Sequence, residues 1–302
     1  MACGCLIDVG NALVTLTEVI GNPYKIEGAA HVSVSGGLTS HYMLRQILDA
    51  HGGALPPDVH ALFCNTGKER EETLAFVSET SARWNVPIVW LEYVPPSEGE
   101  DASFRVVTYD TASRRGEPFD ALIEHRSKIN EAGHSTLPNP VAPWCSSELK
   151  QRTMRRYMTS LGYEEWTSVV GLRADERKRV ARMQGRKAEG GWIEMPLARA
   201  GVGVGDVAAF WAVQPFTLRL RAYEGNCDLC YKKAKWKIQK MMVERPELSA
   251  WWESAEKRTG TVFRQDRPRY VQLRRNAQAQ GFLDVGAVDV DDEDDIPCAC
   301  TD

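Results

Sequence analysis

The sequence predicts an α/β protein: a doubly wound, mostly parallel sheet with helices on both faces, followed by a helical C-terminal extension. The first observation behind this prediction is an alternation of strand-like and helical patterns over the first two thirds of the chain. Apolar strand-like runs occupy residues 29–34, 59–64, 87–93 and 167–172, and a helical pattern occupies residues 71–84. Such alternation is typical of a parallel sheet covered by helices. The second observation is the turn that follows the first strand.

This turn contains two glycines, Gly36 and Gly37, between a strand and a helical pattern. Glycines let the backbone bend tightly against an anion, and the unpaired N–H groups of the following helix point at it. Ser35, Thr39 and Ser40 add hydroxyl donors. No Gly-Lys-Ser/Thr ends the loop, so it is not a Walker A loop. Because ligands bind at the carboxyl end of such sheets, we expect an anion site here, the alternative being a plain tight turn.

The chain divides into three parts by pattern. Residues 1–222 are expected to form the α/β domain, with a less regular insertion at 94–144 that has a strand-like run at 104–109 and a helix-like one at 119–129. Residues 223–283 are expected to be helical, with helices at 231–243 and 246–257. Residues 284–302 carry eight acidic residues and no Lys or Arg, which predicts a flexible acidic tail.

Composition favours an ordinary enzyme-sized protein of 302 residues, of which 43% are hydrophobic. No apolar stretch approaches the ~20 residues of a membrane-spanning helix, and residues 1–10 lack the pattern of a secretion signal. We therefore expect a cytoplasmic protein with no membrane partner. Residues 148–240 carry nineteen Lys and Arg against ten Asp and Glu, although the whole chain has a net charge of −4. This region is expected to attract phosphorylated ligands or nucleic acid, the alternative being a solvated basic face.

Aromatic residues of the C-terminal part and two near the candidate site have two interpretations. They can stack on bases, but packing against the core is the interpretation that we favour. The residues concerned are Trp144, Trp192, Trp236, Trp251, Trp252, Phe263 and Tyr270.

Eight cysteines in this setting indicate thiols, metal ligands or redox groups rather than structural disulfides. Cys227 and Cys230 form a CxxC pair that is expected to open a basic helix, where the thiolate pKa would be lowered. Thiolates at this spacing bind zinc or an iron–sulfur cluster, or form a redox pair. Cys145 is the best candidate for a further metal ligand. The other candidates are Cys64, for which a buried apolar role is favoured, and Cys3, Cys5, Cys298 and Cys300.

Five motifs in order resemble the phosphoadenosine phosphosulfate (PAPS) reductase family, within the PP-loop or ATP-pyrophosphatase-like superfamily. Residues 35–40, SGGLTS, are similar to its SGGxxS phosphate loop, and residues 65–74, NTGKEREETL, are similar to its NTGxExxETL segment. Cys145 with the Leu-Lys pair at 149–150 is similar to its cysteine-and-LK segment. Residues 171–177 resemble its GxRxxES stretch, and residues 195–207 its PL…DV stretch. The likeness covers residues 31–240.

This resemblance implies that residues 1–222 bind an adenine nucleotide. The loop would hold the terminal phosphate or sulfate through Ser35, Gly36, Gly37, Thr39 and Ser40, and a second segment would lie beside the nucleotide through Thr66, Gly67 and Glu69. Lys150, Arg173 and Arg177 would neutralise phosphate or sulfate charge, with Lys150 and Arg173 in the catalytic set. The physical chemistry agrees, because Arg offers a planar fork for oxyanions and Lys a point charge.

Two kinds of reaction use such a site. In nucleotide-sulfate reductases a cysteine of a C-terminal segment attacks the sulfur of the phosphosulfate, and Cys298 or Cys300 is the candidate here. In ATP pyrophosphatases the loop holds the β- and γ-phosphates with Mg²⁺, and a substrate oxygen attacks the α-phosphorus. The chain departs from both patterns: its end is not of the ECGLH type, a single Cys145 replaces a Cys-Cys pair, and Thr39 replaces the Asp of SGGxDS loops.

Three functional interpretations follow. The favoured one is a PAPS reductase-like enzyme that binds adenylyl sulfate, PAPS or ATP and reduces sulfate or transfers sulfur. It would carry a 4Fe-4S cluster on Cys145, Cys227 and Cys230, similar to the three-cysteine arrangement of tRNA sulfur-inserting enzymes, and would use a reductant or sulfur-donor protein. The alternatives are a nucleic-acid-thiolating ATP pyrophosphatase, with the basic region holding phosphate backbones, and a nucleotide sensor with structural zinc.

Overall fold

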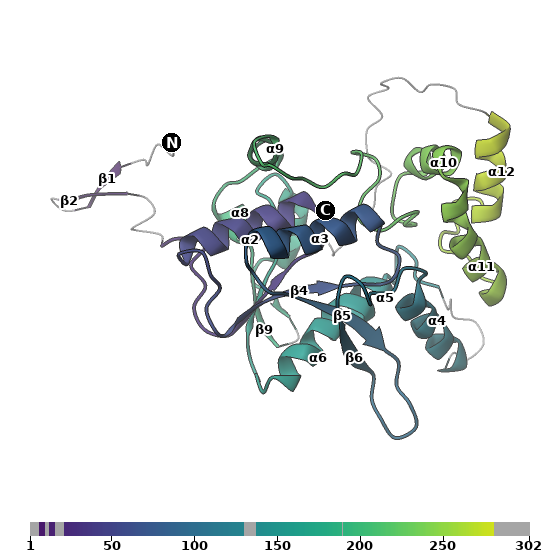
Figure 1. Ribbon diagram of the computed structural model, residues 1–302, viewed down its shortest axis with the longest axis horizontal. Helices are drawn as coiled ribbons and strands as arrows, with labels where there is room; N and C mark the ends of the chain where they lie inside the picture. The colour runs from purple at the N-terminus through teal and green to yellow at the C-terminus, as the bar shows by residue number, and fades with distance from the viewer. Residues whose placement is uncertain (1–5, 10–11, 16–20, 130–136, 189, 281–302) are drawn as a thin grey trace.

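A seven-stranded sheet organises the chain in the computed structural model, which describes residues 6–9, 12–15, 21–129, 137–188 and 190–280 (Figure 1). Its strand order is β6-β5-β4-β3-β7-β9-β8. The five inner strands are parallel, and the edge strands β6 and β8 pair antiparallel with β5 and β9. The predicted mostly parallel sheet is therefore confirmed. The strands are β3 (Ala30–Ser33), β4 (Val59–Cys64), β5 (Ile88–Val94), β6 (Ser103–Val107), β7 (Thr167–Val169), β8 (Lys187–Ala188) and β9 (Gly191–Glu194), with a separate hairpin of β1 (Leu6–Val9) and β2 (Ala12–Thr15).

Helices follow the strands and then form the C-terminal part of the chain (Figure 1). They are α2 (Leu38–Ala50), α3 (Glu71–Arg83), α4 (Glu117–Ile129), α5 (Trp144–Ser146), the π-helix η1 (Ser147–Arg152), α6 (Thr153–Ser160), α7 (Arg177–Met183), α8 (Pro196–Arg199), α9 (Val204–Ala212), α10 (Lys235–Glu244), the 3-10 turn η2 (Pro246–Leu248), α11 (Ser249–Thr259) and α12 (Tyr270–Gln280). The mostly α/β order with a helical C-terminal region agrees with the prediction. No helix of the described residues is both long and apolar enough to cross a membrane.

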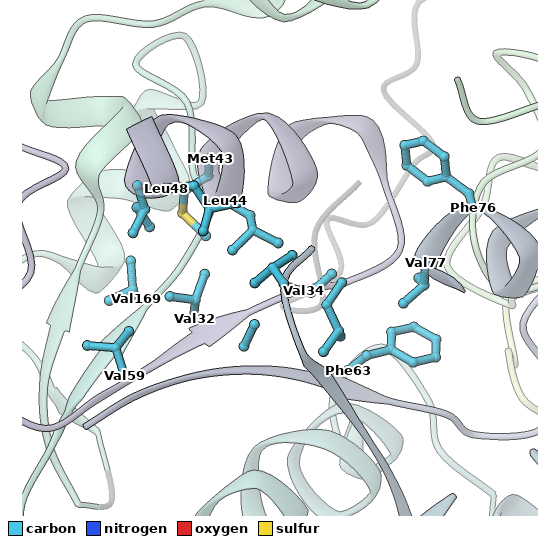
Figure 2. Close-up of a cluster of buried hydrophobic side chains, with 14 of the residues drawn as sticks. Val32, Val34, Met43, Leu44, Leu48, Val59, Phe63, Phe76, Val77 and Val169 are labelled. Atoms are coloured by element: carbon cyan, nitrogen blue, oxygen red, sulfur yellow. The ribbon is translucent and has the colours of Figure 1, made fainter. Parts of the chain in front are cut away.

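Strand β4 shows why helices cover both faces of the sheet. Val59, Ala61 and Phe63 point to one face and Leu62 and Cys64 to the other, and nearly all of β4 is buried. The first face packs against α2, α3 and α9, and Figure 2 shows side chains of α2 and α3 gathered over those of β3 and β4. The second face packs against α6. The doubly wound arrangement follows from this period of two.

A second apolar cluster joins the C-terminal helices to the sheet. Trp252 of α11 is buried against Phe119 of α4 and stacks on Tyr270 of α12 at 5.2 Å between ring centroids. Trp144, Trp251 and Phe263 belong to the same cluster, so their predicted packing role is confirmed. Trp192 differs: it is 55% exposed on β9, and the packing prediction is wrong there because its ring lies beside the Lys187 ammonium of edge strand β8 instead of in the core. The three-part division of the chain stays a prediction.

The CxxC pair does not open a helix. Helix α10 begins at Lys235, and residues 221–234 form turns, because the segment pairs with residues 68–70 instead. The expected acidic tail, with Cys298 and Cys300, and the N-terminal Cys3 and Cys5 lie outside the described residues.

Two histidines are buried in the core and uncharged. His31 on β3 lies 2.9 Å from Ser168 Oγ through its Nε2 atom, and His41 on α2 donates from Nδ1 to the Gly37 carbonyl at 2.9 Å. Burial lowers the pKa of each imidazole to about 4. Both groups therefore bind protons more weakly in the folded than in the unfolded chain.

We expect acid to destabilise the fold through these histidines. Because the folded pKa lies below the unfolded value of 6.5, the unfolded state binds more protons between pH 6.5 and 4, and stability falls as pH drops through that window. For His31 the loss between neutral pH and pH 4.5 is expected to be about 2–3 kcal/mol. Urea unfolding of the wild type and His31→Asn at both pH values measures it. The variant should lose that much less stability on acidification, and equal pH dependence in both proteins would contradict the assignment.

Candidate functional site

The loop after β3 has the backbone shape that its two glycines predict. Gly36 has φ +88°, a conformation that favours glycine, and a Cβ at this position would collide with the Thr73 methyl group of α3. Gly37 precedes α2, and no side chain caps the N-terminus of that helix. The first N–H groups of α2 have no partner within the helix, so they are available to an oxyanion at the carboxyl end of β3.

Two hydroxyl groups fix the shape of the loop. The Ser35 N–H donates to Ser40 Oγ at 3.1 Å, the Ser40 hydroxyl donates to the Gly37 carbonyl at 3.0 Å, and the Ser35 and Ser40 hydroxyls lie 3.0 Å apart. Asn226, from the segment that carries the CxxC pair, donates to the Ser35 carbonyl at 3.1 Å. The predicted loop residues are thus together, and the C-terminal part of the chain contacts them directly.

Arg173 reaches this loop as predicted, whereas Arg177 does not contact it in the structure. The Arg173 guanidinium donates to Thr39 Oγ1 at 3.2 Å and is held by Asp175 at 3.0 Å. The backbone at Gly171, two residues before Arg173, lies close to the start of α2: a Cβ on Gly171 would be 3.3 Å from Ser40 Cα. Arg177 starts α7 with an exposed side chain, so its role as an oxyanion ligand stays a prediction.

A cavity of about 350 Å³ lies beside the loop. That volume is within the range of small-molecule sites. Apolar side chains form part of the cavity wall, and Ser35, Lys150 and the arginines of η1 and α6 add polar groups. The apolar lining residues are Val34, Met154, Trp166, Val170, Met183 and Ile193. This combination suits a ligand with an apolar body and an anionic end, and we call it the nucleotide cavity.

The segment after β4 pairs with the CxxC segment. Arg70 N–H donates to the Asn226 carbonyl at 2.8 Å and Asp228 N–H to the Lys68 carbonyl at 2.9 Å. Lys68 Nζ lies 2.8 Å from Asp228 Oδ2, and both side chains are only 7% exposed. The Trp252 indole N–H donates to the other Asp228 oxygen at 2.8 Å. This pairing, which we call the seam, brings residues about 160 positions apart into one site.

Within the seam, Thr66 and Glu69 bind each other. Thr66 donates to Glu69 Oε2 through its N–H at 2.7 Å and its hydroxyl at 2.8 Å, and the Glu69 side chain is fully buried. Gly67 has φ +76°, and a Cβ there would lie 2.8 Å from Gly116 N. Of the residues predicted to bind a nucleotide or its phosphates, Ser35 and Lys150 line the nucleotide cavity. The others do not line it, so their contact with a nucleotide stays a prediction; they are Gly36, Gly37, Thr39, Ser40, Thr66, Gly67, Glu69, Arg173 and Arg177.

The three predicted metal-binding cysteines line one cavity. Cys145, Cys227 and Cys230 come together there with Thr66 and Lys150, although the cavity holds only about 30 Å³, enough for one or two water molecules. Cys145 Sγ lies 3.6 Å from the Tyr231 hydroxyl. We call this the cysteine cavity. Cys64 lies outside it, 2% exposed, and burial raises the pKa of its thiol to about 12, which agrees with the apolar role favoured for it.

Lys150 lies between the two cavities. Lys150 and Ser146 line both the nucleotide cavity and the cysteine cavity. Lys150 Nζ is 3.3 Å from Glu69 Oε1, the oxygen that the Cys227 thiol approaches at 3.8 Å. Lys150 belongs to the π-helix η1, a conformation that is frequent at functional sites. No residue pattern in the sequence predicts a π-helix, so only its Leu-Lys pair pointed to this position.

The prediction of a lowered thiolate pKa at the CxxC pair is wrong for Cys227. Burial, with a smaller contribution from the Glu69 carboxylate, raises the pKa of the Cys227 thiol, and Lys150 and Lys233 oppose that rise incompletely. No helix N-terminus lies at this position to help them. Binding of a metal at Cys227 therefore requires loss of a proton from a buried thiol.

The donor set of the cysteine cavity fits an iron–sulfur cluster better than it fits zinc. Three thiols around one cavity fit an iron–sulfur cluster, in which each cysteine holds a different iron. They fit zinc less well, because zinc needs its ligands around a single point, and the described part of the chain has no such group of three or more Cys, His, Asp or Glu. A cluster is larger than the cavity, so the cavity walls would have to move apart around it.

Comparison with known proteins gives distant likenesses. No protein family model matches the chain. The uncharacterized nin region protein ORF290 of Escherichia phage lambda is 29% identical over 209 residues, which are 68% of this chain and 67% of that protein. A PAPS reductase from Candida auris, solved with phosphate, is 16% identical with a TM-score of 0.37, over 65% of this chain and 81% of its own. The U34-tRNA thiolase NcsA from Methanococcus maripaludis, solved with its 4Fe-4S cluster, is 13% identical with a TM-score of 0.42, over 87% of this chain and 75% of its own.

Gly36→Ala tests the shape of the loop. We expect the free energy of unfolding to fall by about 2–4 kcal/mol, because residue 36 has a left-handed backbone conformation and its new methyl group would collide with Thr73. Gly52→Ala is the matched control, since Gly52 has φ +72° with open space around its Cβ, and should lose only about 1 kcal/mol. Adding Thr73→Ser removes the colliding methyl group and should restore part of the stability of Gly36→Ala. Equal urea midpoints for the two alanine variants would contradict the steric argument.

Asp228→Asn tests the seam. The variant keeps a hydrogen-bond acceptor for Trp252 but leaves the buried Lys68 ammonium unpaired, so about 3 kcal/mol of unfolding free energy should be lost. Asp120→Asn is the control, because Asp120 also accepts a tryptophan N–H but pairs with the exposed Arg258, and its loss should stay near 1 kcal/mol or below. Similar losses of unfolding free energy in both variants, measured with urea, would contradict the larger contribution assigned to the buried Lys68–Asp228 pair.

Proposed function

We propose that this chain is a PAPS reductase-like enzyme of the PP-loop type, which binds an adenine nucleotide and reduces sulfate or transfers sulfur. The observation that carries the proposal is the common wall of the two cavities. A nucleotide bound beside the loop would meet Lys150 and Ser146 on one side, and the thiols of Cys145, Cys227 and Cys230 would meet the same two residues on the other. An activated phosphate or sulfate and a sulfur centre are then neighbours.

The nucleotide side of the wall binds charge. The N–H groups at the start of α2 and the Arg173 guanidinium meet at Thr39, which suits the terminal phosphate or sulfate of adenylyl sulfate, PAPS or ATP. Lys150 adds a positive charge to the wall of the nucleotide cavity, which Ser35 of the loop also lines. Positioning and charge neutralisation of this kind supply most of the rate in phosphoryl and sulfuryl chemistry. Mg²⁺ would accompany ATP.

The sulfur side of the wall supplies soft ligands. Cys145, Cys227 and Cys230 would hold a 4Fe-4S cluster, which when bound supplies redox chemistry and an iron without a protein thiolate. Burial is the largest cause of the raised pKa of the Cys227 thiol, Glu69 adds to that rise and Lys150 opposes it, so the two members of the buried Lys150–Glu69 pair act on this ligand in opposite directions. Cys298 and Cys300 stay predicted nucleophiles, and a reductant or sulfur-donor protein stays a predicted partner.

A nucleic-acid-thiolating enzyme is the second candidate function. The observation that favours it is the position of two arginines, Arg152 and Arg155, at the border of the nucleotide cavity. They suit an acceptor that carries phosphate groups.

The spectrum of protein purified without oxygen tests the sulfur side. The wild type should have a broad absorption at about 400 nm, which is typical of iron–sulfur charge transfer. It should also contain iron and sulfide in matching amounts. Cys227→Ser should lose it, whereas Cys64→Ser, which changes a buried cysteine outside the cysteine cavity, should keep it. A colourless wild type with bound zinc would contradict the cluster and leave a nucleotide-sensing role.

Calorimetric titration with ATP and with adenylyl sulfate tests the nucleotide side of the same proposal. Arg173→Gln should weaken binding by about 10-fold to 100-fold, because a charge-assisted hydrogen bond to the oxyanion is lost. Arg45→Gln changes a half-buried arginine farther along α2 that pairs with Asp49, and this variant should bind as the wild type does. Absence of nucleotide binding in the wild type would contradict the proposal whatever the spectrum shows.

A further inference from the structure

A second large cavity, of about 720 Å³, lies between α4, η1, α6 and the loop after β5. Figure 1 shows α4 and α6 near one another beside β5 and β6. Among the described residues its lining includes four arginines: Arg126 of α4, Arg152 of η1, and Arg155 and Arg156 of α6. We call it the arginine cavity. Neither the nucleotide loop nor the cysteines line it.

Two of these guanidinium groups are held against aromatic rings. Arg126 lies over the Trp144 ring at 4.8 Å from its centroid, and Arg156 lies over the Tyr93 ring at 5.8 Å. Contact with a ring face fixes the plane of a guanidinium group, so less conformational entropy is lost when it binds a ligand. The two groups come from different helices, so the cavity wall holds two guanidinium groups whose orientation is fixed before a ligand binds.

Each of the two groups also has a buried nitrogen that lacks an acceptor. Arg126 Nε and Arg156 Nη1 are inaccessible to solvent and have no hydrogen-bond partner in the described part of the chain. Buried donors in folded proteins almost always have a partner, and an unsatisfied charged donor is costly. Both guanidinium groups therefore keep donor capacity that the described residues do not satisfy, and a ligand in the cavity would have to bind the other nitrogens of these groups.

Acidic residues of the described lining contact two of its four arginines. Glu148 pairs with Arg152 and lies 3.9 Å from Arg156 Nη2, while Asp101 is exposed at the rim. Arg126 and Arg156 present planar, always charged groups to the cavity, and such groups favour a ligand with negatively charged oxygens, above all phosphate.

The arginine cavity borders the nucleotide cavity. Arg152 and Arg155 line both. A ligand in the arginine cavity would thus lie next to a nucleotide, on the far side of these two side chains from the loop. An acceptor that reacts with an activated nucleotide would need such a position.

We propose that the arginine cavity binds phosphate groups of the second substrate of this enzyme. The phosphates belong to the backbone of a nucleic-acid strand or to a small phosphorylated molecule, and the chemistry of recognition is the same for both. Occupation of the cavity by phosphate does not depend on the proposed function, and only its role as the acceptor site rests on it.

Arg126→Gln and Arg156→Gln in the full chain test the proposal, with Arg83→Gln as the matched control. Arg83 is an exposed arginine at the end of α3, paired with Glu79 and outside both cavities, so its variant removes the same charge. The probes are fluorescent single-stranded DNA and RNA, followed by anisotropy at several salt concentrations, and inorganic pyrophosphate, followed by calorimetry. Arg126→Lys keeps the positive charge but replaces the planar guanidinium group by an ammonium group. It replaces Arg126→Gln in the experiment if that variant does not fold.

A nucleic-acid source predicts that the cavity variants bind the oligonucleotides about tenfold more weakly than Arg83→Gln does, with a salt dependence reduced by about one phosphate contact. A small-molecule source predicts equal oligonucleotide binding and about a tenfold loss of pyrophosphate affinity in the cavity variants alone. If neither probe distinguishes the cavity variants from Arg83→Gln, the proposal is overturned.

ATP titration of the same variants separates this inference from the proposed function. Arg126→Gln should bind ATP as the wild type does, because Arg126 neither lines the nucleotide cavity nor contacts the loop, whereas Arg173 donates to Thr39 of the loop. Pyrophosphate binding that is lost in Arg173→Gln but kept in Arg126→Gln would assign the ion to the loop and overturn the proposal. A chain that binds no ATP but shows the Arg126 effect would keep the phosphate site and refute the nucleotide function.

Discussion

The buried pair of Lys68 and Asp228 is the interaction on which the candidate site depends. Both groups lose most of their water on folding, so they are tolerated only when they meet, and Trp252 and the Trp251 ring surround them. Their pairing aligns the segment after β4 with the CxxC segment, and backbone hydrogen bonds on either side continue the alignment. The same alignment brings Asn226 onto the Ser35 carbonyl. A single seam thus joins the anion loop, the cysteines and the C-terminal helices.

Electrostatics of the site converge on Lys150. Its ammonium group lies beside the buried Glu69 carboxylate, and both act on the Cys227 thiol in opposite directions. Since Lys150 also faces the nucleotide cavity, any anion bound there changes the charge balance at the cysteines. The π-helix carries this lysine, and the Cys64 thiol donates to its carbonyl at 3.5 Å, so a cysteine without a metal-binding role helps to hold the helix that positions Lys150. Lys150 and Ser146 are thus the side chains that the two cavities share.

Much of the fold was predictable because hydrophobic period is a local property. The strand at 59–64 and the helix that begins at Glu71 appear where the pattern predicts them, and the loop glycines adopt the expected turn. Cys145, Cys227 and Cys230 line one cavity, and their metal-binding role stays a prediction. Two of the wrong predictions, the helix at the CxxC pair and the lowered Cys227 pKa, assumed that this segment is governed by its own sequence. Pairing across the seam overrides that local preference, and burial beside Glu69 reverses the pKa shift.

By itself, the sequence determined the parallel sheet, the glycine-containing loop after β3 and the set of thiols and basic groups available for chemistry, because each depends on neighbours along the chain. Only the tertiary structure decided which of those groups act together. Arg173 lies on the loop while Arg177, four residues later, is exposed; Arg126 and Arg156 meet in a cavity although they come from different helices. Charge, burial and hydrogen bonding depend on distances in space, and residues far apart in the chain set those distances only when the core packs.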